Sequence, residues 1–233
     1  MYFDLFASIF ALAANPLELR IDVSLPPDEV ERELEMLNER LNSPDDALHE
    51  LPRLCIHYPG LIFRYREADG EHYIYVQDMQ RACLAGYTVL NRLIELTRRA
   101  DPVLRAPHSK YAAAYQRRGI ATAIYRWWLD SGNCLISGAR QSAGAHSLWK
   151  SLNQQYGMIY VDLRNKTLRC LGRRVSDEVQ SDLHTRLVML GKGWTVEGLK
   201  AATGMQGEIG DDRIGRLPGS GAQDAHQDDR KLA

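Results

Sequence analysis

The stretch "YQRRGIATAIYRWWLDSG", residues 115–132, places two arginines and a glycine directly before a helical apolar pattern. Its apolar positions recur at helical spacing, at Ala121, Ile124 and Trp128. We expect a helix that begins at Gly119 and is ended by Gly132. A helix N-terminus carries partial positive charge and unpaired N–H groups, so Arg117 and Arg118 stand where cations are disfavoured. A bound phosphate would explain the pair, and an ordinary solvated patch is the alternative.

The composition is that of a globular protein that is not generally basic. The chain has 233 residues, of which 45% are hydrophobic and 25% charged, enough to bury a core in one domain with additions or in two small domains. Its formal net charge is −1, so we expect neither nucleic acid nor an anionic membrane as a partner. The four cysteines are Cys55, Cys83, Cys134 and Cys170. They are far apart and lie in or beside apolar runs, which predicts buried free thiols and a cytoplasmic location.

The N-terminal 16 residues contain an apolar run that ends in small residues, loosely like a signal peptide. Asp4 stands where a signal peptide carries positive charge, and the run is too short to span a bilayer. We therefore expect a packed N-terminal helix, with a cleaved signal as the alternative.

Hydrophobic periodicity predicts the elements that precede the arginine pair. Alternation over residues 17–25 predicts a half-buried strand, and the 3.6-residue spacing that starts near Asp28 predicts an amphipathic helix. Two strand-like runs flank Asp69–Gly70, a dipeptide typical of a hairpin turn. Residues 83–96 are rich in strand formers and predict a third strand of this meander. Residues 100–114 predict a short strand or a loop that leads into the arginine pair.

The elements expected after the first helix are a buried strand at 134–139, a helix at 142–157, a strand pair turning at Asn165–Lys166, a helix at 176–191 capped by Ser176, and a short helix at 195–204. Beyond Gly207 there is almost nothing apolar to bury, which predicts a disordered tail. The domain division that follows is an N-terminal helix (1–16), a main domain (17–160), a C-terminal strand and helix extension (161–206) and the tail (207–233).

Residues 116–121 match the pattern Q/R-x-x-G-x-G/A, and residues 142–149 partly match N-x-x-A-x-x-L-Y on the following helix. With the order of elements, these motifs resemble the GCN5-related N-acetyltransferases (GNAT), including members carried by phages and prophages. The resemblance implies an α/β protein of the α+β type, with a mixed, mostly antiparallel sheet flanked by helices. It also implies acetyl-CoA as co-substrate and an amine as acceptor. The residues that it assigns to acetyl-CoA binding are Gln116, Arg117, Arg118, Gly119, Ile120, Ala121, Thr122 and Ser142.

The resemblance also points to catalytic residues. Glu95 occupies the third meander strand, where many GNAT members carry the carboxylate that deprotonates the amine, although a surface or ion-paired glutamate is the simpler reading. Trp149 replaces the family tyrosine that protonates the departing thiolate, and an indole N–H does not give up its proton near neutral pH. Tyr156 and His146, which share the helical face of Trp149, are the expected substitutes. Water is the other source, or catalysis has been lost.

Three classes of function follow for the chain. The first is an N-acetyltransferase acting by direct attack on a small-molecule or protein amine, with a homodimer left open. The second is a non-catalytic module that binds CoA or keeps only the fold, and the third and weakest is a nucleic-acid-binding module. The histidines have no metal-ligand spacing, so we expect no metal site.

Overall fold

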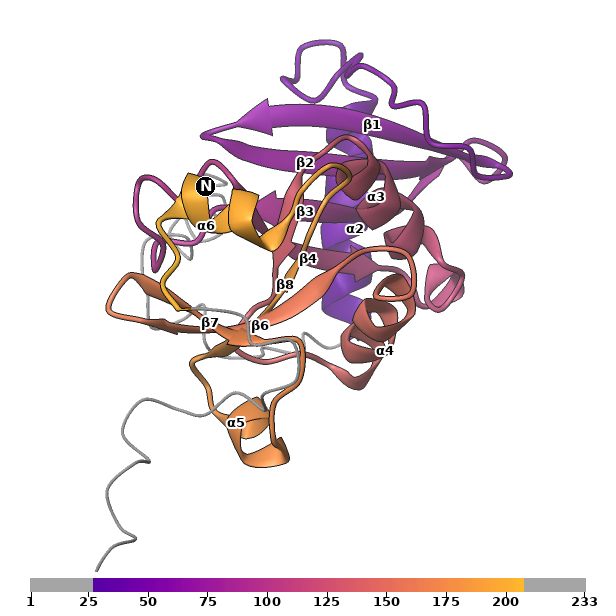
Figure 1. Ribbon diagram of the computed structural model, residues 1–233. Helices are drawn as coiled ribbons and strands as arrows, with labels where there is room; N and C mark the ends of the chain where they lie inside the picture. The colour runs from indigo at the N-terminus through magenta and orange to yellow at the C-terminus, as the bar shows by residue number, and fades with distance from the viewer. Residues whose placement is uncertain (1–26, 208–233) are drawn as a thin grey trace, which may run out of the picture.

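The computed structural model describes residues 27–207, so the helix expected at 1–16, the strand at 17–25 and the tail beyond 207 lie outside the described residues. The elements, in chain order, are α2 (Pro27–Leu41), β1 (Leu61–Ala68), β2 (Glu71–Asp78), β3 (Cys83–Asn91), β4 (Leu104–Tyr111), the 3₁₀ turn η3 (Ala113–Tyr115), α3 (Ile120–Asp130), β5 (Cys134–Ile136), α4 (Ala143–Leu152), β6 (Met158–Arg164), β7 (Thr167–Gly172), α5 (Asp177–Ser181), β8 (Thr185–Met189) and α6 (Val196–Thr203). The strands form one sheet in the order β1-β2-β3-β4-β5-β8-β6-β7. Of the strand pairs within residues 27–207, only β4–β5 is parallel, so the expected mixed, mostly antiparallel sheet flanked by helices is confirmed (Figure 1).

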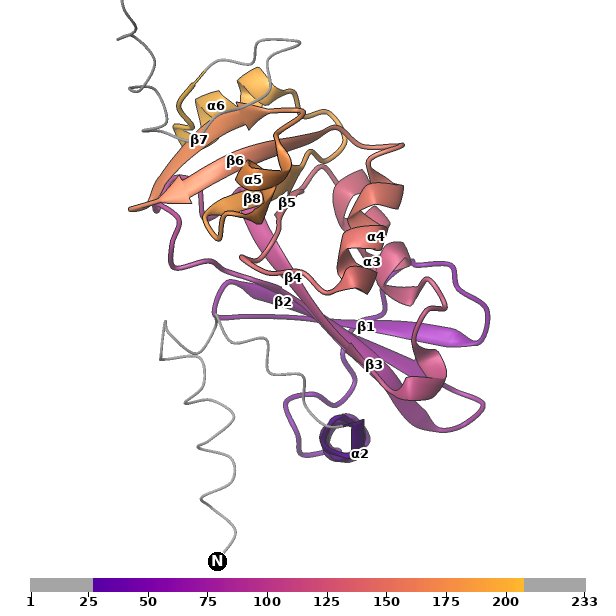
Figure 2. The ribbon, with the colours of Figure 1, turned by 90° about the horizontal axis from the view of Figure 1, so that it is seen from below.

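The first half of the sheet is the expected meander. Asp69 and Gly70 both have positive φ, 55° and 75°, which suits the tight turn between β1 and β2. α2 packs on the face of β3 that is turned away from α3 and α4, as Figure 2 shows with α2 seen end-on. Glu33 of α2 accepts hydrogen bonds from the Tyr87 hydroxyl (2.6 Å) and the Lys110 ammonium (2.7 Å), which ties this helix to β3 and β4.

The other face of the meander is covered by α3 and α4, which lie side by side (Figure 2). Ile124 and Leu129 of α3 are fully buried against sheet residues such as Ile74 and Leu135. Trp149 of α4 is also buried in this cluster. Burial of each such side chain contributes about 1.5–3 kcal/mol to folding, so this cluster fixes α3 against the sheet.

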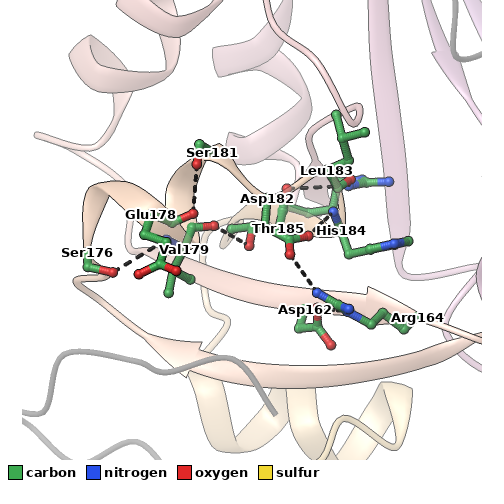
Figure 3. A network of polar contacts seen from close by, with 11 residues as sticks. Asp162, Arg164, Ser176, Glu178, Val179, Ser181, Asp182, Leu183, His184 and Thr185 are labelled. Carbon is green, nitrogen blue, oxygen red and sulfur yellow. Dashed lines mark hydrogen bonds and ion pairs between the residues drawn. The ribbon is translucent and has the colours of Figure 1, made fainter. Parts of the chain in front are cut away.

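The prediction of a helix over residues 176–191 was wrong for its second half. α5 ends at Ser181, and Thr185–Met189 form β8, which pairs with β5 on one side and β6 on the other. Residues 161–206 therefore contribute strands to the same sheet as the main domain. Figure 3 shows the polar contacts at the switch from helix to strand. Asp182 accepts hydrogen bonds from the His184 backbone N–H (2.7 Å) and from Arg164 of β6 (2.7 Å), which anchors the turn that ends α5.

We predict that Asp182→Asn destabilises the protein in a pH-dependent way. The His184 N–H, and after it the Arg164 guanidinium, hold the pKa of Asp182 below its usual value. The stabilisation is therefore complete above about pH 4 and is lost as the pH falls through the folded-state pKa. Urea unfolding should give a loss of about 1–3 kcal/mol at pH 7 and a smaller loss near pH 3. The exposed Asp45→Asn is the control, and an equal loss for Asp182→Asn at both pH values would contradict the prediction.

All four thiols are unpaired, as expected, but only two are buried. Cys134 and Cys170 lie in the core, and burial raises the pKa of Cys134 to about 11. Cys55 is exposed and Cys83 half-buried, which corrects the expectation for these two. No helix within residues 27–207 is long and apolar enough to cross a membrane.

Candidate functional site

The parallel strands β4 and β5 separate almost as soon as they pair. Leu104 pairs with Cys134 and Arg105 with Leu135, and the pairing then stops, although β4 continues to Tyr111. Beyond Arg105 the described strands therefore leave one edge of β4 without a partner.

The backbone groups that face this open edge can be read from the register with β3. The Ala112 N–H donates to the Ala85 carbonyl (3.1 Å), and in an antiparallel pair every second residue makes such bonds while those between face away. The residues of β4 that face away are therefore Pro107, Ser109 and Tyr111. A proline, which has no N–H, suits an outward position. The N–H groups of Ser109 and Tyr111 consequently point to the side that β5 has left.

The chain then turns sharply into α3. Arg117 and Gly119 have φ angles of 57° and 80°, in the left-handed region, and Gly119 is the N-cap of α3. Among the residues that the structure describes, no side chain caps this helix, whereas α4, α5 and α6 are capped by Ser142, Ser176 and Thr195. The first N–H groups of α3 have no acceptor within the helix, and turns of this kind bind anions.

The turn is firmly attached although its side chains are exposed. The Tyr58 hydroxyl donates to the Arg118 carbonyl (2.5 Å), and the Gln116 amide donates to the Tyr111 carbonyl (3.0 Å). The Tyr115 hydroxyl donates to Asp78 (2.7 Å). This hydrogen bond is the main reason why the pKa of Asp78 is lowered. A fixed turn with free N–H groups needs little ordering when a ligand binds.

A further cation at this turn, Arg81, was not predicted from the sequence. The Arg118 guanidinium carbon lies 5.3 Å from the centre of the Tyr115 ring, and that of Arg81 lies 5.8 Å from the same ring. Arg81 belongs to the turn between β2 and β3, and nothing in its local sequence marks it, because only the fold brings that turn to Tyr115.

Glu95 does not lie where the sequence placed it. β3 ends at Asn91, so Glu95 is in the turn that follows the strand. Its carboxylate is 3.5 Å from the Arg186 guanidinium of β8, and it is partly exposed whereas Arg186 is buried. The pair lies on the face of the sheet that α6 covers, because Arg186 alternates in register with Val188 of that core.

The residues expected on the following helix are not gathered at the turn. α4 ends at Leu152, so Tyr156 lies outside it, in contrast to the expected helix that reached residue 157. The Tyr156 hydroxyl donates to Asp130 (2.8 Å) at the C-terminal end of α3, and burial raises its pKa to about 12. An 11-residue helix is roughly 16 Å long, so Tyr156 sits far from the Gly119 end. Together with Trp194, Tyr156 lines a separate surface hollow of about 680 Å³.

The other expected residues of α4 have local roles in the structure. The Ser142 hydroxyl accepts the Ala145 N–H (3.2 Å) as the N-cap of α4. His146 is half-buried on the same helix, and Trp149 is 2% exposed in the core. No cluster of His, Cys, Asp or Glu within residues 27–207 could hold a metal ion.

Comparison with known proteins gives limited similarity. No family model matches the chain, and no curated protein matches it. One similar solved structure is a chimera of the spermidine N-acetyltransferase SpeG from Vibrio cholerae and hSSAT, at 14% identity and a TM-score of 0.32 over 71% of this chain and 92% of that one. Another is a GNAT superfamily phosphinothricin acetyltransferase from Sinorhizobium meliloti in complex with AcCoA, at 14% identity and a TM-score of 0.33 over 72% of this chain and 87% of that one. Both neighbours are acetyltransferases by name, and likeness at this level establishes neither the function nor the site of this chain.

Proposed function

We propose that this protein binds acetyl-CoA between β4 and the start of α3 and transfers the acetyl group to an amine. One observation carries the proposal. The parallel strands β4 and β5 diverge after Arg105. The open edge of β4 leads through the turn that carries Arg117 and Arg118 to the start of α3, which has no side-chain cap among the described residues. The sequence pattern at residues 116–121, which resembles the GNAT signature, supports the same assignment.

Each part of the site suits one part of acetyl-CoA. The first N–H groups of α3, at Ile120, Ala121 and Thr122, would donate hydrogen bonds to the pyrophosphate, and Arg117 and Arg118 would balance its charge. The amide-containing arm would follow the open edge of β4 back from Tyr111 toward Arg105. Its amides can pair with the outward backbone groups of β4 in the manner of a strand.

The chemistry then needs two proton transfers and no covalent enzyme intermediate. The amine must be neutral before its lone pair attacks the thioester carbonyl. Glu95, which lies in the turn after β3 with its carboxylate 3.5 Å from the Arg186 guanidinium, is the carboxylate that we assign to take up the amine proton, directly or through water. An outward N–H of β4 would stabilise the oxyanion that forms. The C–S bond breaks as the amide forms, and the sulfur takes a proton. Tyr156, whose hydroxyl donates a hydrogen bond to Asp130 at the far end of α3, is poorly placed for this last step.

The test is an assay of the full chain with acetyl-CoA and a panel of amines: polyamines, amino acids, amine-bearing antibiotics and peptide N-termini. Calorimetry measures binding, and release of free thiol measures turnover. We expect saturable binding and turnover with one class of amine. Binding without turnover would favour the second candidate, a CoA-binding module without catalysis, which the buried Trp149 in place of the family tyrosine favours. No binding would overturn both.

A further inference from the structure

Three hydroxyl groups of β3 and β4 form a connected network beside α3. The Thr88 hydroxyl lies 2.8 Å from the Ser109 hydroxyl and 2.9 Å from the Tyr111 hydroxyl. Tyr125 of α3 lies beside this network: burial raises its pKa to about 12, and the nearby Ser109 hydroxyl lowers it.

The network adjoins the open edge of β4. Ser109 and Tyr111 are two of the residues whose backbone faces away from β3, beyond the point where β5 leaves. Ser109 is partly exposed, whereas Thr88 and Tyr125 are buried, and burial also raises the pKa of the Tyr111 hydroxyl. A ligand arm that follows this edge from the Gln116–Gly119 turn toward Arg105 must pass Ser109.

We propose that Ser109 is the catalytic proton donor to the departing sulfur, with Thr88 and Tyr111 as its proton relay. The assignment rests on the proposed acetyl transfer. It fills the role that Trp149 cannot perform, since an indole does not give up its proton near neutral pH.

The relay accounts for every proton. The C–N bond forms, the C–S bond breaks, and the sulfur takes the Ser109 hydroxyl proton. A serine hydroxyl is too weak an acid to act alone, so Thr88 replaces that proton as it leaves, and Tyr111 replaces the proton of Thr88. Burial raises the pKa of the Tyr111 hydroxyl, so its proton is returned along the same chain, from water through Ser109 and Thr88, once the thiol has left the open edge. The amine gives its own proton to Glu95, so the products are a neutral amide and a thiol.

The test compares kcat and KM of the full chain with its Ser109→Ala, Ser109→Thr and Tyr111→Phe variants, using the amine found in the turnover assay. A general acid typically contributes 10²–10⁴-fold, so we expect Ser109→Ala to lower kcat about 100-fold with the KM for acetyl-CoA unchanged. Ser109→Thr keeps a hydroxyl and should recover most of the rate, and Tyr111→Phe should give an intermediate loss. Tyr87→Phe is the matched control, because it removes a buried tyrosine hydroxyl from the α2 face of β3.

The outcomes separate this assignment from the function on which it rests. Wild-type turnover with an unchanged kcat for Ser109→Ala overturns the relay alone. An equal loss in Tyr87→Phe, or a loss in Ser109→Ala that appears only in KM, also overturns it. A 100-fold loss in His146→Ala would move the donor to α4 and overturn it as well. Absence of turnover in the wild type overturns both the relay and the transferase proposal.

Discussion

Gly119→Ala is expected to weaken acetyl-CoA binding about 100-fold while leaving the protein folded. Gly119 has φ of 80°, and a Cβ built there meets no atom of residues 27–207 within 4 Å apart from its neighbours in the chain. The folded protein therefore bears only the strain of a left-handed alanine, about 1 kcal/mol. The open space around the new methyl group is the space through which a phosphate would approach the first N–H groups of α3. Calorimetric titration measures the affinity, and Gly119→Val should remove binding altogether.

The same helix provides the control. Gly132, just beyond its C-terminal end, has a nearly identical φ of 81°, and its Cβ would lie 3.6 Å from the nearest atom, the Lys192 carbonyl oxygen. Gly132→Ala should therefore have a similar cost in stability but bind acetyl-CoA like the wild type. Equal affinity for Gly119→Ala and Gly132→Ala would remove the phosphate site from this turn.

Gly86→Ala is expected to have the largest effect on stability of the substitutions considered. A Cβ at Gly86 would lie 2.2 Å from Tyr111 Cδ1 and 2.4 Å from the Lys110 carbonyl oxygen. Part of that contact is backbone, so β3 and β4 must move apart. Overpacking of this kind costs roughly 3 kcal/mol or somewhat more, which lowers the Tm by about 6–12 °C. Thermal unfolding measures the shift.

Gly144→Ala is the matched control for that experiment. This glycine lies in α4, and the nearest atom to its Cβ is the Ser142 hydroxyl oxygen at 4.0 Å. An alanine there should raise stability by up to about 1 kcal/mol, because alanine is the better helix former. If Gly86→Ala melts like the wild type, the close packing of β3 on β4 is not as described.

Much of the fold followed from local patterns in the sequence. The Asp69–Gly70 hairpin, α2 and the pair β6–β7 follow from turn residues and periodicity that agree with their final environment. β8 could not be found in this way. Its run of Leu187, Val188 and Met189 is apolar on both faces, which suits a strand buried inside a sheet and a buried helix equally well. Pairing with β5 and β6 decided the outcome, and that is long-range information.

The same difference between local and long-range information applies to the residues of the candidate site. Residues 116–122 are contiguous, so a local motif could identify the turn and the start of α3 together. Glu95 and Tyr156 were placed by extending an element four or five residues past its true end, where boundaries are least certain. Arg81 and the Ser109 network depend on the register of β2, β3 and β4, which no single stretch encodes.

Amide hydrogen exchange along β4, read residue by residue with and without acetyl-CoA, tests the central claim most directly. The N–H groups of Ser109 and Tyr111 face the open edge, whereas the N–H of Lys110 between them is paired with β3. If the acetyl-CoA arm binds along this edge, exchange at Ser109 and Tyr111 should slow at least tenfold, and exchange at Lys110 should change little. Binding of acetyl-CoA with no change at Ser109 and Tyr111, or with equal slowing at all three residues, would contradict the account.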